Sequence, residues 1–172
     1  MKSLLRKSYY KPWAYAHSRH WSPRAQAAGV KAIVIPAVEV ANFERVRLLA
    51  HSFEQGFYAL GIHPMYVERA APEALAQLRE SLLQYRSDPK LIAVGEIGLD
   101  LYWDKSFVDA QRTAFRMQVE WAKELELPIA IHAREAFQEI YEVLDEINDD
   151  RLTGVFHCFT GTEADANQIL SY

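Results

Sequence analysis

The sequence predicts an α/β protein that forms part of an eight-unit (β/α) barrel, with about five β/α units present. Short apolar runs alternate with amphipathic segments from about residue 24 onward, a pattern typical of βαβ units and a parallel sheet. The units repeat at roughly thirty residues, whereas a complete barrel needs about 250 residues. A chain of 172 residues therefore accounts for only part of a barrel.

The first strand is expected at residues 32–37, which form a continuous apolar run. Such a run is typical of a strand covered on both faces. Asn42 is a plausible N-cap for a helix from residue 43 to about 53, and Gly56 breaks the chain after it. The next strand is expected at residues 57–62, before His63.

The helix that follows this strand has Pro72 in its first turn. Its apolar residues recur at helical spacing, namely Leu75, Leu78, Leu82 and Leu83. A strand at residues 91–95 leads into residues 96–100. A long helix from about residue 108 to 125 then stops before Pro128.

Pro128 opens a strand at residues 129–131. The following helix, from residue 135 to about 147, places apolar side chains on one face: Phe137, Ile140, Tyr141 and Leu144. The last strand is expected at residues 154–156, and a final helix begins near Thr162. Right-handed crossovers would place all these helices on one side of a curled sheet.

The composition is that of a globular protein of the cytoplasm. Half of the residues are hydrophobic and 24% are charged. No apolar run approaches the roughly 18–20 residues that span a bilayer, so we expect no membrane helix. The single cysteine, Cys158, excludes an intramolecular disulfide and favours a reducing compartment. The net charge of −4 is not that of a protein that coats nucleic acid, but bound divalent metal ions could supply positive charge locally.

Residues 1–23 form an atypical N-terminal segment, distinct from the barrel domain at 24–172. No acidic residue precedes Glu39, whereas basic and hydroxylated residues are frequent there. This composition resembles a transit peptide for an organelle. The alternative is a non-native N-terminus without a targeting role.

Polar residues recur where the predicted strands end. Glu96, His132 and His157 each follow an apolar strand, and His63 has the same position on an earlier strand. Since the C-terminal strand ends of a barrel converge on one face, a carboxylate and two imidazoles would meet there as ligands for Zn²⁺, Mn²⁺ or a similar ion. Taken singly, each histidine could be a hydrogen-bonded structural residue, and Glu96 could cap backbone amides.

Four segments strongly resemble the TatD-like metal-dependent deoxyribonucleases. They are Val94-Gly95-Glu96-Ile97-Gly98-Leu99-Asp100, Gly61-Ile62-His63-Pro64, Pro128-Ile129-Ala130-Ile131-His132-Ala133-Arg134 and Val155-Phe156-His157-Cys158-Phe159-Thr160-Gly161. The resemblance implies a metal-dependent hydrolase TIM barrel. It also implies hydrolysis of phosphodiesters in DNA, single-stranded or at ends, with two divalent ions (Zn, Mg or Mn). By the same resemblance, Glu96 is the catalytic carboxylate that bridges the ions, and His132 and His157 are ligands of one ion.

Three further residues are candidates for substrate binding. Arg134 could pair with a phosphate through its planar guanidinium, or form a surface ion pair with Glu135 or Glu139. His63 could face the substrate or lie behind the metal ligands, although a core hydrogen bond fits equally well. Asp100, with the neighbouring aromatic residues Tyr102 and Trp103, could line the cleft and present a ring to a base; packing against the next loop is the alternative.

The match to the family breaks at both ends of the chain. Family members begin with a strand that ends in His-x-His, whereas this sequence has His17-Ser18-Arg19-His20. Alternating side chains would send these two histidines to opposite faces of a strand. The sequence also ends at Tyr172, before the late Asp ligand of the family. We therefore expect weak metal binding and little hydrolysis from this chain alone.

Two alternatives remain open from the sequence. Related barrels hydrolyse amides, lactones or phosphotriesters, but many bridge their metals with a carboxylated lysine, which the Glu96 motif argues against. The chain could instead be a catalytically silent fragment or pseudoenzyme that acts through a partner or a copy of itself. The oligomeric state is left open.

Overall fold

The fold is a half-barrel of five parallel strands that alternate with helices, as the sequence predicts. The structure is a computed structural model that describes residues 23–172, apart from the side chains of residues 68–71. The strands are β1 (Ile33–Pro36), β2 (Gly56–Leu60), β3 (Leu91–Asp100), β4 (Ile129–Arg134) and β5 (Gly154–Phe156). Each strand pairs in parallel with the next, so the spatial order equals the sequence order, β1-β2-β3-β4-β5.

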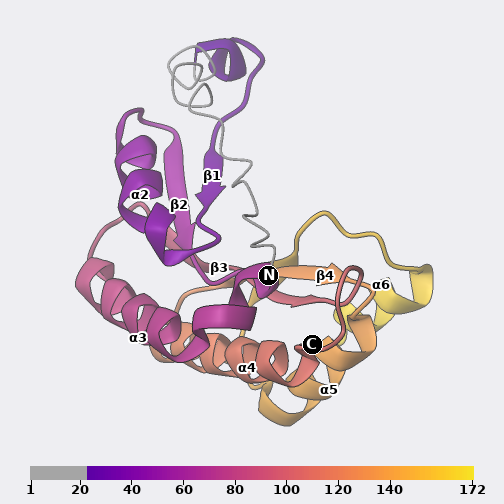
Figure 1. The fold of residues 1–172 in the computed structure, drawn as a ribbon. Helices are drawn as coiled ribbons and strands as arrows, with labels where there is room; N and C mark the ends of the chain where they lie inside the picture. The colour runs from indigo at the N-terminus through magenta and orange to yellow at the C-terminus, as the bar shows by residue number, and fades with distance from the viewer. Residues whose placement is uncertain (1–22) are drawn as a thin grey trace, which may run out of the picture.

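The helices follow one another around the outside of this sheet (Figure 1). They are α2 (Phe43–His51), α3 (Val67–Tyr85), α4 (Val108–Glu124), α5 (Phe137–Ile147) and α6 (Glu163–Ile169), with 3-10 turns at η1 (Val40–Asn42) and η2 (Pro64–Tyr66). α2 packs on β2, α4 packs on β3, and α4 lies between α3 and α5. This arrangement directs the C-terminal ends of all five strands to the same rim.

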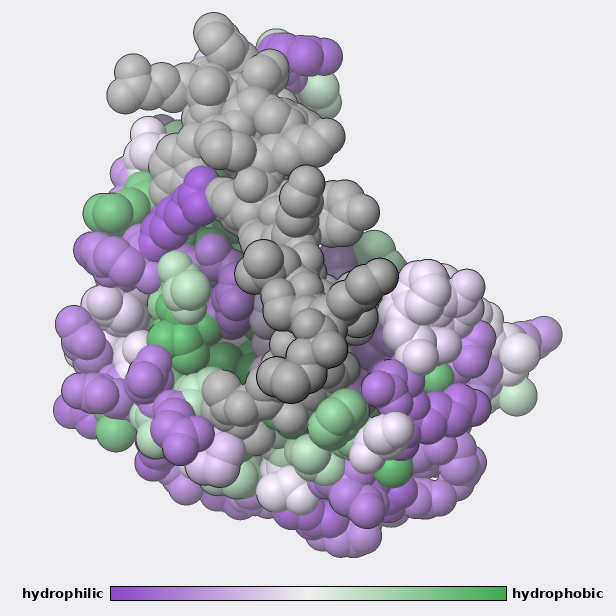
Figure 2. Space-filling view, in the orientation of Figure 1, coloured by the Kyte–Doolittle hydropathy of each residue, from purple (hydrophilic) through white to green (hydrophobic). Residues whose placement is uncertain are grey.

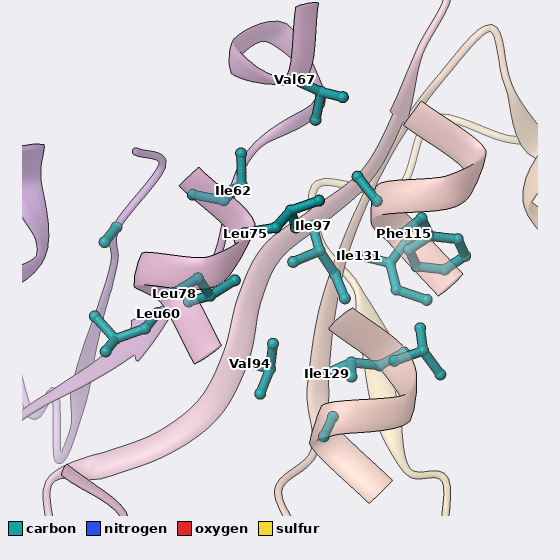
Figure 3. Close-up of a cluster of buried hydrophobic side chains, with 14 of the residues drawn as sticks. Leu60, Ile62, Val67, Leu75, Leu78, Val94, Ile97, Phe115, Ile129 and Ile131 are labelled. Atoms are coloured by element: carbon teal, nitrogen blue, oxygen red, sulfur yellow. The ribbon is translucent and has the colours of Figure 1, made fainter. Parts of the chain in front are cut away.

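The hydrophobic core lies between the sheet and its helices (Figure 3). The strands contribute Leu60, Val94, Ile97, Ile129 and Ile131, the segment after β2 contributes Ile62, and the helices contribute Leu75, Leu78 and Phe115, all of them buried. Complete burial of one such side chain stabilises a fold by about 1.5–3 kcal/mol. This packing fixes β2, β3 and β4, the strands that lead to the candidate site.

Some element boundaries differ from those expected. The sequence places Pro72 in the first turn of its helix, but α3 begins at Val67 and continues across Pro72. A proline inside a helix removes one backbone donor and crowds the carbonyl four residues earlier, at a cost of about 3 kcal/mol, yet α3 continues across this position. α2 ends at His51, two residues early, and the side chain of Asn42 binds Glu39 at 2.9 Å without capping the helix.

The surface over the outer helices is mainly hydrophilic, as Figure 2 shows on the side where α3, α4 and α5 lie. No helix in residues 23–172 has the length and apolar character needed to cross a membrane.

Candidate metal centre

Glu96 owes its position to an irregularity in β3. The register pairs Gly95 with Ala130 and then Ile97 with Ile131, so Glu96 is an extra residue without a partner on β4. Such a bulge changes the direction in which a side chain points, and bulges are frequent beside active sites. The flanking residues Gly95 and Ile97 are buried, whereas Glu96 keeps partial access to solvent.

Glu96 meets His132 at the rim of the half-barrel. The Nδ1 atom of His132 lies 3.2 Å from Oε1 of Glu96, and its Nε2 atom lies 3.0 Å from Oδ2 of Asp100. The register opposes Gly98 to His132. Gly98 has a φ of +131°, and a Cβ atom there would overlap the carbonyl oxygen of His132. Only glycine therefore permits this approach of β3 to the His132 backbone.

The charges of these groups stabilise one another. The hydrogen bond to His132 lowers the pKa of Glu96 below its ordinary value, against the effect of burial. Burial alone would lower the pKa of His132, but its hydrogen bonds with Glu96 and Asp100 outweigh burial and raise this pKa. The position between the two carboxylates of Glu96 and Asp100 therefore favours a cation.

His63 is the third member of the cluster. Its ring centre lies 4.3 Å from that of His132, and donor atoms of His63, Glu96 and His132 all lie within 4.8 Å of one another. Burial and the charge of His132 lower the pKa of His63 to about 4, so the ring is neutral at pH 7. Its Nδ1 atom accepts the amide N–H of Met65 at 3.2 Å. The proton of the neutral ring therefore sits on Nε2, which makes this atom a hydrogen-bond donor; for Nε2 to bind a metal ion, the proton would have to move to Nδ1.

Asp100 is 5% exposed and uses both carboxylate oxygens within the protein. Oδ2 faces His132, and Oδ1 accepts the amide N–H of Tyr102 at 3.1 Å. These contacts suit a group that orients His132, in the manner of a carboxylate–histidine–metal arrangement. They suit direct binding of substrate, the role expected from the sequence, less well.

Two buried glutamines of α4, which the sequence analysis did not single out, fix the backbone at this rim. Gln118 accepts the amide N–H of Ile62 at 2.8 Å and donates to its carbonyl at 3.3 Å. Gln111 makes the same pair of contacts with Asp100, at 2.9 and 3.3 Å. The available signal was their seven-residue spacing on a helix face that is otherwise apolar.

His157 lies just beyond β5, on the strand next to that of His132. Its backbone N–H binds the carbonyl of Ile131 at 2.8 Å, but its side chain is exposed, with Nε2 3.3 Å from Sγ of Cys158. The ring is close enough to Glu96 for its charge to lower the pKa of that carboxyl. Its donor atoms lie outside the group formed by His63, Glu96 and His132.

The remaining candidates differ in outcome. Arg134 lies over the ring of Tyr102, and no carboxylate in residues 23–172 forms an ion pair with it, so the alternative pairing with Glu135 or Glu139 is absent. Thr162 is an ordinary N-cap, because it forms a capping box with Asp165. His17 and His20 lie outside the described residues.

The donor set fits a divalent cation. Glu96 offers carboxylate oxygens, His132 offers an imidazole nitrogen, and Asp100 can hold the opposite nitrogen of that ring. Oxygen and imidazole ligands of this kind suit Zn²⁺, Mn²⁺ and related ions. A cation at this point would also be attracted by the carboxylate of Glu96, whose pKa is lowered.

Comparisons with known proteins show which family this chain resembles. The family model described as "TatD related DNase" matches residues 13–172. An uncharacterized metal-dependent hydrolase of Escherichia coli, YjjV, is 37% identical over 147 residues, which cover 86% of this chain and 56% of the relative. A protein named 3'-5' ssDNA/RNA exonuclease TatD, from Cronobacter turicensis, is 32% identical over 148 residues, 86% of this chain and 55% of the relative.

The fold comparison gives the same relation. The crystal structure of the TatD homologue YjjV from Escherichia coli aligns with a TM-score of 0.85 and 34% identity, over 94% of this chain and 61% of that one. The chain thus spans a little over half the length of the curated relatives it matches.

Proposed function

We propose, from the premise that this chain belongs to the TatD-related DNase family of metal-dependent hydrolases, that its rim binds a divalent ion and hydrolyses phosphodiester bonds of nucleic acid. The single observation that carries the proposal is the contact of Glu96 with His132, with Asp100 on the far side of the same imidazole ring. Residues far apart in the sequence meet there, and this convergence supports their proposed roles.

Glu96 and His132 are the proposed ligands, and Asp100 positions His132. Asp100 keeps Nε2 of the ring as its hydrogen-bond partner, which leaves Nδ1, the atom beside Glu96, for the ion. When bound, divalent ions lower the pKa of water and neutralise the charge that develops on phosphoryl oxygens. The low pKa of Glu96 keeps this carboxylate ionised and ready to bind a cation at neutral pH.

His157 is proposed as a further ligand, as the family resemblance implies. Its position at the end of the strand beside β4 and its electrostatic effect on Glu96 support this role. Its side chain would have to turn away from Cys158 to reach the ion. The proposed site in this chain therefore has two ligands in contact and one nearby.

His63 and Arg134 are proposed to bind the substrate. The Nε2–H of the neutral His63 ring can donate a hydrogen bond to a phosphate oxygen at the cluster. The guanidinium of Arg134 has no carboxylate partner in the described part of the chain, so its donors are available to a phosphate. The relative named as an ssDNA/RNA exonuclease supports nucleic acid as the substrate class.

The test combines metal binding with hydrolysis. The full chain would be titrated with Mn²⁺, and cleavage of a labelled single-stranded oligonucleotide would be followed with and without the ion. We expect weak binding and slow, metal-dependent cleavage, with both reduced to background in Glu96→Gln and His132→Gln. Glu54→Gln is the matched control, because this exposed carboxylate lies before β2 at the opposite end of the strands.

A panel of simple esters and cyclic amides separates this proposal from the related hydrolases. If the chain cleaved members of this panel but not DNA, its substrates would be esters or amides and not phosphodiesters. Metal affinity unchanged in both Glu96→Gln and His132→Gln would refute the assigned site.

A further inference from the structure

Two exposed aromatic side chains and a half-buried arginine form an aromatic and cationic platform beside the candidate metal centre. The platform consists of Tyr102, Trp103 and Arg134. The Cζ atom of Arg134 lies 3.7 Å from the centre of the Tyr102 ring and 5.7 Å from that of Trp103. The two aromatic rings meet edge to face, with centres 4.6 Å apart and planes at 88°.

The backbone fixes the platform relative to the metal centre. Arg134 follows His132 by two residues on β4, so both side chains belong to the same face of the strand. Two residues of a strand span about 6.6 Å. The loop that carries the aromatic residues is also anchored, because Leu101 donates its N–H to the Arg134 carbonyl at 3.0 Å and Tyr102 donates to Asp100.

The platform differs from the other arginine–aromatic contacts in the described residues. Arg47 lies over Tyr85 and also pairs with Glu44. Arg79 lies over Trp121 and also pairs with Glu124. Arg134 has the shortest of these ring contacts, and no carboxylate in residues 23–172 accompanies it.

The aromatic rings are unusually exposed. Trp103 is 70% exposed and Tyr102 is 46% exposed, although large aromatic side chains are normally well buried. Because Arg134 covers a face of Tyr102, the Trp103 ring is the open stacking surface. An open indole beside a guanidinium that no carboxylate of residues 23–172 pairs with combines the two features by which proteins hold single-stranded nucleic acid.

We propose that the platform is a subsite for an unpaired nucleobase next to the phosphate held at the metal centre, an inference that rests on the proposed function. A base would stack on Trp103, and Arg134 would face the adjoining phosphate. A base in a duplex is already paired and stacked, so the platform selects single strands. Every base has a π face, and the subsite therefore discriminates little among sequences.

The test separates bases from phosphates. Binding of the full chain is measured by fluorescence anisotropy, with a chelator present, to three probes of equal length: a single-stranded DNA, an abasic strand with the same phosphates, and a duplex. We expect the wild type to bind the single strand about tenfold more tightly than either other probe. Trp103→Ala should remove this preference while leaving abasic binding unchanged, and Trp103→Phe should keep most of it. Arg134→Met should weaken binding of both single-stranded probes.

Trp103 is largely exposed, so its substitution should preserve the fold, which circular dichroism would verify. An unchanged preference in Trp103→Ala, a wild type that binds the abasic strand equally well, or the absence of binding to any probe would overturn the subsite. The proposed function fails separately, if the wild type binds the single strand with this preference but cleaves nothing when Mn²⁺ is added.

Discussion

At the scale of single residues, the centre depends on contacts that the sequence pattern only partly reveals. The positions of Glu96 and His132 after apolar runs predicted that these residues would meet, because parallel strands bring their C-terminal ends to one rim. The tautomer of His63 could not be predicted, since it depends on the amide of Met65 in a 3-10 turn. Nor could the side-chain direction of His157, because a strand pattern fixes the face of a residue but not its rotamer.

The lowered pKa of His63 makes a prediction for the pH dependence of stability. The unfolded ring binds a proton below its ordinary pKa of 6.5, whereas the folded ring stays neutral until about pH 4. The folded state therefore loses stability as the pH falls from 6.5 towards 4, by about 2 kcal/mol at pH 5. His63→Asn removes this penalty while an amide oxygen can still accept the Met65 N–H.

The free energy of unfolding of wild type and His63→Asn would be measured in urea at pH 7.5 and pH 5, without metal. The substitution should destabilise the protein less at pH 5 than at pH 7.5, by about 2 kcal/mol. Equal effects at the two pH values would contradict the assigned neutral ring.

At the scale of elements, continuous apolar runs predicted the five strands of residues 23–172, and helical spacing of apolar residues predicted most of their helices, because each apolar face packs against the sheet. Boundaries were less predictable. β3 continues to Asp100, beyond the apolar run at 91–95, because pairing with β4 extends through the polar motif. The sequence did not predict the role of Gln111 and Gln118 in α4, because glutamine is usually exposed. The structure buries both side chains against the backbone of Asp100 and Ile62.

Gln118, one of the two buried glutamines of α4, gives a prediction for this element. Gln118→Met leaves the N–H and the carbonyl of Ile62 without their partner in the core, although the side chain has similar volume. An unsatisfied buried group costs about 1–3 kcal/mol, so we expect a loss of about 2–4 kcal/mol in the free energy of unfolding.

Gln138→Met on α5 is the matched control. This exposed glutamine makes one long contact, to Glu142 at 3.4 Å, and its substitution should change stability by less than about 0.5 kcal/mol. Chemical denaturation of both variants would check the difference. Similar losses in the two variants would mean that the contacts of Gln118 contribute little.

At the scale of the whole molecule, the five strands form an open sheet whose two outer strands each have one partner. β1 pairs with β2 and β5 pairs with β4 in the described residues. The sequence predicted this open arrangement from the number of β/α units alone. The expectation that the first strand is covered on both faces is wrong, because Val34 in β1 is 48% exposed. Val155 in β5, on the other outer strand, is 61% exposed.

An exposed strand edge with an apolar side chain favours pairing with another chain. We therefore expect the chain to associate increasingly as its concentration rises, and Val155→Lys to suppress this association, because a lysine on an edge strand opposes edge-to-edge pairing. Leu170→Lys is the control: Leu170 is more exposed, at 84%, but follows α6 and lies on no strand. Sedimentation velocity at several concentrations would compare the three proteins. If the strand edge drives association, Leu170→Lys should behave as the wild type. A wild type that stays monomeric throughout, or two variants with equal effects, would mean that the β5 edge does not direct association.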